Sequence, residues 1–299
     1  MRGMKGKIFP FIATLMGALV LIATSALAVP LEIYVSSKHG KVGKLDLSTG
    51  QITEEQSFTL TNTNYAKYGL VDIAFDTSGQ LYGLTFDTFY KLDLASGDVI
   101  ASNNFGTKNQ SKTWLNALVI GADDGGKEVG YAMGYDNTNL FKMDLDTGEK
   151  TDTGWSTGWY SHGDLEWDGN DNLILAGGPT GRDESFLIDL DPVNQTVDSA
   201  EAITDASSDE PYNNVYALAY IDDTMYGILN NTDNLTYDYF TIDLATGAAT
   251  LLGTEAFGDF GPIYGSAVKA SPTPEPATMM LVGVGLIGIA GIRRRISKS

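Results

Sequence analysis

Short apolar runs alternate with polar turns along most of the chain, a pattern that predicts strands joined by tight hairpins. Five of the runs end in a related motif, in which an Asp lies between two apolar residues. The copies are Lys44–Gly50, Lys91–Gly97, Lys142–Gly148, the degraded Leu187–Pro192, and Thr241–Gly247. The flanking apolar residues place the Asp on the opposite face of a pleated strand, and the closing Gly suits a left-handed turn position. We therefore predict a strand that enters a hairpin, with turn amides donating hydrogen bonds to the Asp carboxylate.

The motifs recur at intervals of 47, 51, 45 and 54 residues, measured from Asp to Asp. A period in this range, made of short strands, is typical of a propeller blade with four antiparallel strands. The first unit lacks an innermost strand, whereas an additional strand, Ile263–Val268, follows the last unit. We therefore predict an all-β fold, a five-bladed β-propeller closed by pairing of Ile263–Val268 with Leu31–Val35. A sixth blade would need a strand within Thr204–Asn214, whose Asp, Ser and Pro content favours a loop.

The first 28 residues have the three parts of a secretory signal peptide. Basic residues precede the apolar run Ile8–Ile22, and the small residues Ala26 and Ala28 form an Ala-x-Ala site. This order predicts cleavage by signal peptidase and export of the rest of the chain. An uncleaved membrane anchor is the alternative.

Residues 272–299 also divide into three parts, after the predicted propeller domain at residues 29–271. The parts are Pro274-Glu275-Pro276, the uncharged glycine-rich run Ala277–Ile292, and the cluster Arg293, Arg294 and Arg295. Sixteen residues would form a single transmembrane helix of roughly 24 Å, which is short for a bilayer core of about 30 Å and suits a transient anchor. The arginines predict that this end stays on the cytoplasmic side of the inner membrane.

Together these three parts resemble the PEP-CTERM sorting domain. The resemblance implies processing near Pro274-Glu275-Pro276 by an exosortase, a membrane protease of transpeptidase type. It also implies a Gram-negative bacterium that makes exopolysaccharide and biofilm, with the protein at the cell surface, in the outer envelope or in the extracellular matrix. The resemblance concerns the sorting and localisation of the protein and not the activity of residues 29–271.

Charge and composition narrow the partners of the predicted propeller. Residues 29–271 contain 37 acidic and 12 basic residues, a formal net charge of −25. Such a surface repels phosphate backbones, so nucleic acid is excluded as a partner. The chain has no cysteine, which excludes disulfides, thiolate metal ligands and cysteine nucleophiles.

One segment carries a cluster of side chains suited to ligand binding. Four ring-bearing side chains lie within eight positions, and two acids follow: Trp155, Trp159, Tyr160, His162, Asp164 and Glu166. Aromatic faces stack on sugar rings and carboxylates accept hydrogen bonds from sugar hydroxyls, so the segment is a candidate polysaccharide site. The alternative is that Trp155 and Trp159 pack between blades.

Polar residues also begin three of the predicted innermost strands, at Asp72, Asn116 and Asp164. At the mouth of a central channel their oxygens could bind Ca²⁺, the one cofactor that the sequence suggests. Asp72 and Asp164 could instead form the carboxyl pair of a glycoside hydrolase, which requires an open pocket and a separation of about 5–9.5 Å. The third interpretation is that these side chains accept hydrogen bonds from amides of neighbouring strands.

These observations favour a non-catalytic, exported binding module that acts on matrix polysaccharide. Two alternatives stay open on the sequence alone. One is a glycoside hydrolase or lyase that uses Asp72 and Asp164, and the other is a purely structural matrix protein without a ligand.

Overall fold

A computed structural model describes residues 32–106 and 114–269 of the chain. The predicted signal peptide and the predicted C-terminal helix lie outside these ranges. Within them the chain forms β-strands and one short 3₁₀ helix, η1 (Ala66–Tyr68). None of the helices in the described ranges is long and apolar enough to span a membrane.

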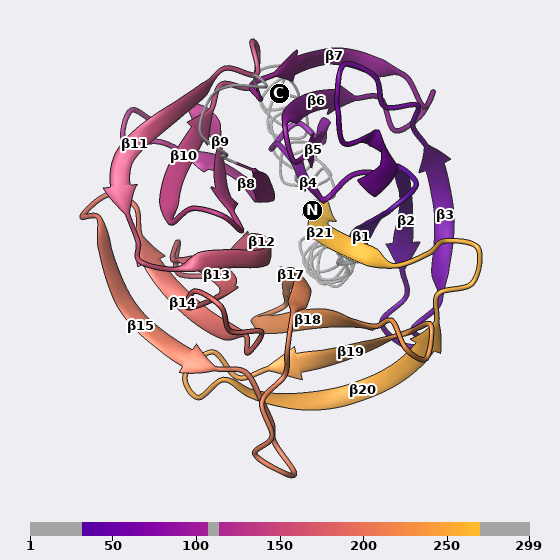
Figure 1. Cartoon of the computed structure of the whole chain (residues 1–299), viewed down its shortest axis with the longest axis vertical. Helices are drawn as coiled ribbons and strands as arrows, with labels where there is room; N and C mark the ends of the chain where they lie inside the picture. Colours follow the sequence, from indigo (N-terminus) through magenta and orange to yellow (C-terminus); the bar gives the residue numbers. More distant parts are fainter. Residues whose placement is uncertain (1–31, 107–113, 270–299) are drawn as a thin grey trace, which may run out of the picture. The chain divides into compact units, whose positions relative to one another are not determined.

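Five sheets follow one another around a common centre, and each has four antiparallel strands ordered from the centre outward (Figure 1). Blade 1 consists of β21 (Ile263–Lys269), β1 (Glu32–Ser37), β2 (Lys41–Leu45) and β3 (Ile52–Ser57). Blade 2 consists of β4 (Asp72–Phe75), β5 (Leu81–Thr85), β6 (Thr88–Leu92) and β7 (Val99–Asn104). Blade 3 consists of β8 (Leu115–Ala122), β9 (Glu128–Gly134), β10 (Asn139–Met143) and β11 (Lys150–Ser156). Blade 4 consists of β12 (Tyr160–Trp167), β13 (Leu173–Gly178), β14 (Phe186–Asp191) and β15 (Thr196–Ala202). Blade 5 consists of β17 (Val215–Ile221), β18 (Thr224–Asn231), β19 (Thr236–Ile242) and β20 (Ala248–Ala256). The predicted five-bladed β-propeller is therefore confirmed.

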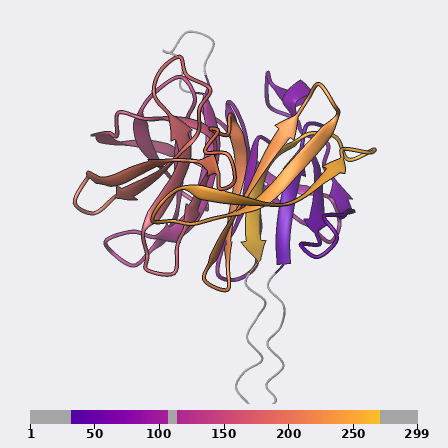
Figure 2. The same cartoon turned by 90° about the horizontal axis from the view of Figure 1, so that it is seen from below.

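The ring is closed by strands from opposite ends of the described chain. β21 pairs antiparallel with β1, with Ile33 opposite Val268 and Val35 opposite Ser266. Figure 2 shows the two strands side by side. The predicted closing pair is thus confirmed. The stretch 204–214 adds only the two-residue strand β16 (Thr204–Asp205), parallel to β20, so it holds no sixth blade.

The apolar core lies between the blades. There are five buried clusters in the described residues, and each one joins two neighbouring blades. Between blades 2 and 3, for example, Leu84 and Phe89 pack with Leu118 and Phe141. Full burial of one such side chain contributes about 1.5–3 kcal/mol, so each sheet depends on its neighbours for most of its stability.

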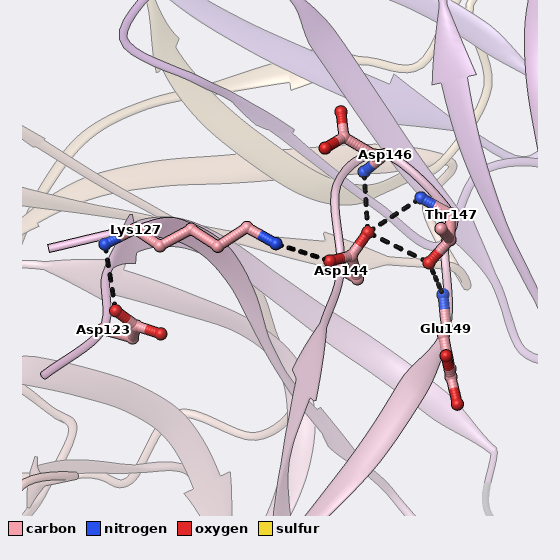
Figure 3. Close-up of polar contacts among 6 residues, drawn as sticks. All are labelled: Asp123, Lys127, Asp144, Asp146, Thr147 and Glu149. Atoms are coloured by element: carbon pink, nitrogen blue, oxygen red, sulfur yellow. Dashed lines mark hydrogen bonds and ion pairs between the residues drawn. The ribbon is translucent and has the colours of Figure 1, made fainter. Parts of the chain in front are cut away.

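The turn between the third and fourth strands has the predicted geometry in blades 1, 2, 3 and 5. In blade 3, Asp144 Oδ1 accepts hydrogen bonds from the amides of Asp146 (3.1 Å) and Thr147 (2.9 Å) (Figure 3). Gly148 has φ +69°. Lys127 Nζ lies 2.6 Å from Asp144 Oδ2. The Lys127 hydrogen bond and the turn amides hold the pKa of Asp144 well below its ordinary value.

Blade 4 departs from the predicted alignment. The repeated sequence motif aligned Asp189 with the aspartates that accept hydrogen bonds from turn amides in the other blades. In blade 4, however, the turn amides of Val193 and Asn194 donate hydrogen bonds to Asp191. The reason is that β14 continues through Asp191 before it turns. Gln195, with φ +57°, occupies the left-handed position that glycine holds elsewhere.

Candidate functional site

The two candidate catalytic carboxyls lie at the centre of the ring, inside the protein and not at an open mouth. Asp72 and Asp164 are both fully buried. Asp164 Oδ2 accepts hydrogen bonds from Leu218 N (2.7 Å), Ser266 N (3.1 Å) and Ser266 Oγ (3.1 Å). Asp72 Oδ2 accepts one from Leu118 N (2.6 Å). The carboxyls therefore tie together the innermost strands of different blades, which is the third of the three interpretations.

The Asp72 and Asp164 carboxyls also influence each other's ionisation. Burial, together with the neighbouring carboxylate, raises the pKa of Asp72 well above its ordinary value. Two buried carboxyls that lie close together cannot both ionise cheaply. The expectation of an open carboxyl pocket for glycoside hydrolysis was wrong, because both groups are enclosed and bonded to protein amides.

The expected grouping of three oxygen ligands is also different from the observed one. Asn116 donates from Nδ2 to the Ser161 carbonyl (3.4 Å), whereas amide donors occupy the oxygens of Asp72 and Asp164. The described residues contain no group of three or more His, Cys, Asp or Glu side chains that could hold a metal ion. Glu166 accepts a hydrogen bond from Trp167 N (2.8 Å), and burial raises the pKa of Glu166 to about 8.

The predicted aromatic platform is divided between the core and a cavity. Trp155 is only 8% exposed and belongs to the cluster between blades 3 and 4. Trp159 packs against the same cluster, with its ring 5.4 Å from that of Phe186. The two tryptophans, Trp155 in β11 and Trp159 in the connection to β12, thus pack between blades, as the alternative interpretation had it.

Tyr160 and His162, in contrast, line a cavity of about 480 Å³. Its walls combine aromatic rings with polar groups from blades 2 to 5. The lining residues are Phe86, Asn116, Tyr135, Tyr160, Ser161, His162, Pro179, Thr180, Gly181, Arg182, Asp183, Asn214 and Tyr216. We call this cavity the face pocket.

Irregular pairing of three innermost strands turns polar residues toward the face pocket. The register shifts at Asn116 in β8, between Ser161 and Asp164 in β12, and at Tyr216 in β17. Such bulges re-aim side chains that a regular strand would direct elsewhere. At Gly163 a Cβ atom would lie 2.4 Å from the Tyr216 carbonyl oxygen, so only glycine lets β12 approach β17 this closely.

His162 is held in place by a residue behind it. Its Nδ1 lies 3.0 Å from Ser185 Oγ, which also accepts a hydrogen bond from Val215 N (2.9 Å). Burial lowers the pKa of His162, so the ring is neutral at pH 7. Ser185 is fully buried, so its hydroxyl positions His162 and is not accessible to a substrate as a nucleophile.

Sequence reasoning missed several lining residues, among them Phe86, Tyr135 and Arg182. They lie on loops between the second and third strands of blades 2, 3 and 4. Phe86 and Tyr135 are in contact, with ring centroids 5.5 Å apart. Their position in the sequence, between the predicted second and third strands of a blade, could have identified them. In a propeller, these loops lie on the same face as the loops that lead into the innermost strands.

Comparison with known proteins identifies the C-terminal segment. Residues 272–295 match the PEP-CTERM protein-sorting motif. The match confirms the resemblance seen in the sequence. The chain is therefore an exported protein that crosses a membrane and is sorted by an exosortase, with a five-bladed β-propeller ahead of the motif.

Several solved structures are similar to the chain at low sequence identity. Hydrazine synthase of Kuenenia stuttgartiensis shares 15% identity over 70% of this chain and 62% of that chain, with a TM-score of 0.42. An auxiliary nutrient binding protein from Bacteroides thetaiotaomicron shares 11% over 74% and 53%, with a TM-score of 0.43. A luciferin-regenerating enzyme shares 13% over 77% and 73%, with a TM-score of 0.42. The chain thus spans less than two thirds of the first two. None of the curated proteins compared with it matches.

Proposed function

We propose that the protein is a non-catalytic binding module, displayed at the cell surface or in the extracellular matrix, that holds an uncharged matrix polysaccharide in the face pocket. The observation that carries this proposal is the pocket itself. Its volume of about 480 Å³ lies within the range of roughly 300–1,000 Å³ that is usual for ligand sites. Aromatic walls with a few converging polar groups suit a sugar ring, which has apolar faces and a hydroxyl-rich edge.

Binding is favoured over catalysis because the two predicted catalytic carboxyls and the hydroxyl next to His162 are enclosed. The Asp72 and Asp164 carboxyls are fully buried and bonded to amides of neighbouring strands. The hydroxyl next to His162 belongs to Ser185, which is also fully buried. Besides rings and amides, a ligand in the face pocket would meet the neutral His162 imidazole, the Asp183 carboxylate and Arg182 in its ion pair with Glu184.

The charge of the protein favours an uncharged polysaccharide. Residues 29–271 carry a formal net charge of −25, which repels anionic polymers at a distance. Arg182 is the one cationic residue among the lining residues, and it lies 3.4 Å from the carboxylate of Glu184 in an ion pair. Little positive charge is thus left at the face pocket to attract a uronic acid or a sulfated sugar.

The test is binding of neutral polysaccharides to the full chain, purified in a detergent without a sugar headgroup, by affinity electrophoresis and calorimetry. We expect binding that Tyr135→Ala weakens by about two- to tenfold, because stacking on a ring contributes about 0.5–1.5 kcal/mol. Tyr135 is 38% exposed, so its truncation should leave the fold intact. Ile100→Ala, which removes another exposed apolar side chain that is not among the lining residues, is the control. Absence of polysaccharide binding by the wild-type protein would refute the proposal.

A further inference from the structure

We infer that the face pocket takes the terminal, uncharged sugar residue of a chain end-on, and that Asn116 and Ser161 bind one of its hydroxyl groups. This inference rests on the proposed function and specifies which part of the polysaccharide is recognised and by which atoms.

Two polar atoms among the pocket residues are buried and have no hydrogen-bond partner within the described protein. They are Asn116 Oδ1 and Ser161 Oγ. Asn116 is 7% exposed and Ser161 is fully buried, yet both line the face pocket. A buried polar group without a partner costs about 1–3 kcal/mol, so two of them side by side need a ligand that supplies the missing bonds.

The chemistry of the two atoms defines the group that would satisfy both. Asn116 Oδ1 only accepts hydrogen bonds, while the Ser161 hydroxyl can both donate and accept. A ligand hydroxyl can donate its proton to Asn116 Oδ1 and accept one from Ser161 Oγ at the same time. Asn116 is held by its own Nδ2 bond to the Ser161 carbonyl, so the acceptor is already oriented. An ionised group here would lose its hydration without gaining an opposite charge.

The protein closes directly beyond this pair of residues. In β8, Leu118 lies two residues beyond Asn116, and its amide donates a hydrogen bond to Asp72. In β17, Leu218 lies two residues beyond Tyr216, and its amide donates a hydrogen bond to Asp164. Ser266 from β21 bonds to the same Asp164 carboxylate, so the innermost strands of all five blades meet at this point. A polymer cannot pass through the centre, and the residue that reaches Asn116 and Ser161 must be the end of a chain.

The substitutions that test this are Ser161→Ala and Asn116→Ala, each expected to weaken binding by about tenfold. The probes are uncharged oligosaccharides of one to six residues, built from glucose, galactose or mannose, titrated into the full chain. Affinity should stop rising after one or two residues, because the rest of the chain projects into solvent. The same oligosaccharide with its hydroxyls methylated should not bind.

Ser37→Ala is the matched control, since Ser37 Oγ is likewise buried and unpartnered but lies outside the face pocket. Both serine variants should keep or raise the thermal midpoint of the free protein, and only Ser161→Ala should lose affinity. Binding that survives in Ser161→Ala and Asn116→Ala, or that keeps rising with oligosaccharide length, overturns the end-on site while leaving the binding function in place. No binding by the wild-type protein would instead refute the proposed function.

Discussion

The central carboxyl Asp164 should be one of the most sensitive positions in the fold, and Asp164→Ala measures how much it stabilises the ring. Its Oδ2 accepts three hydrogen bonds, from Leu218 N, Ser266 N and Ser266 Oγ, in a fully buried environment. Alanine removes the acceptor and leaves the amides of Leu218 and Ser266 enclosed without a partner, on strands of blade 5 and blade 1, whereas Ser266 Oγ keeps the Leu218 carbonyl as an acceptor at 2.5 Å.

The magnitude follows from the number of donors left without a partner. Each buried, unsatisfied donor costs about 1–3 kcal/mol, so the two amides cost roughly 2–6 kcal/mol. Part of this is offset because burial disfavours the charged carboxylate that the substitution also removes, as the raised pKa of Asp164 indicates. We expect a net loss of about 3 kcal/mol, a large share of the roughly 5–15 kcal/mol by which folded domains are stable.

The assay is urea denaturation of the full chain followed by tryptophan fluorescence, with the free energy of unfolding extrapolated to water. Asp93→Ala is the matched control, because Asp93 also accepts two amide hydrogen bonds, from Ala95 and Ser96, but at an exposed turn where water can replace it. We expect a much smaller loss there. If Asp164→Ala destabilises the protein by under about 1 kcal/mol, or by no more than Asp93→Ala does, the buried network does not hold the blades together.

Two further substitutions test how the pocket and its neighbouring loop are built. Gly163→Ala should destabilise the protein by about 1–3 kcal/mol and weaken ligand binding, because the new Cβ would lie 2.4 Å from the Tyr216 carbonyl oxygen. Gly125→Ala is the control, because its Cβ would meet only a side-chain oxygen at 3.2 Å. In the same denaturation and binding assays, Gly125→Ala should change neither stability nor affinity. Asp87→Asn tests a buried carboxylate that receives hydrogen bonds from both Thr63 and Asn64. Burial alone would raise the pKa of Asp87, but these hydrogen bonds lower it, so its stabilisation is complete above the unfolded pKa of about 3.9 and is lost as pH falls through the lower folded value. We expect Asp87→Asn to cost about 2 kcal/mol at pH 7 and less in acid, and an equal cost from pH 7 to pH 2 would contradict this assignment.

The five blades and their closure could be predicted because the relevant signals are local in sequence. The turn aspartate and the glycine four residues later mark the end of each third strand, as at Asp144 and Gly148. The additional strand at Ile263–Val268 identified the closing pair, since blade 1 lacked an innermost strand. The one misalignment, Asp189 in place of Asp191, arose where glycine was missing and β14 ran further.

The candidate site was only partly predictable, because it depends on which way side chains point at irregular positions. Tyr160 and His162 do line the face pocket, but Trp155 and Trp159, a few residues earlier, pack in the core. Trp155 lies in β11 and Trp159 in the connection to β12, whereas Tyr160 and His162 lie in β12 itself, next to the bulge between Ser161 and Asp164. A two-residue alternation does not predict that bulge.

The same bulges explain how one set of innermost strands serves both stability and binding. Ser161 and Asp164 lie three positions apart on β12, with Ser161 at the face pocket and Asp164 at the buried centre. In a regular strand, side chains three positions apart point to opposite faces of the sheet. With the shifted register, Asp164 closes the centre directly behind the pocket. The hydrogen-bonded Asp164 carboxyl that stabilises the ring therefore also limits how far a ligand can enter the face pocket.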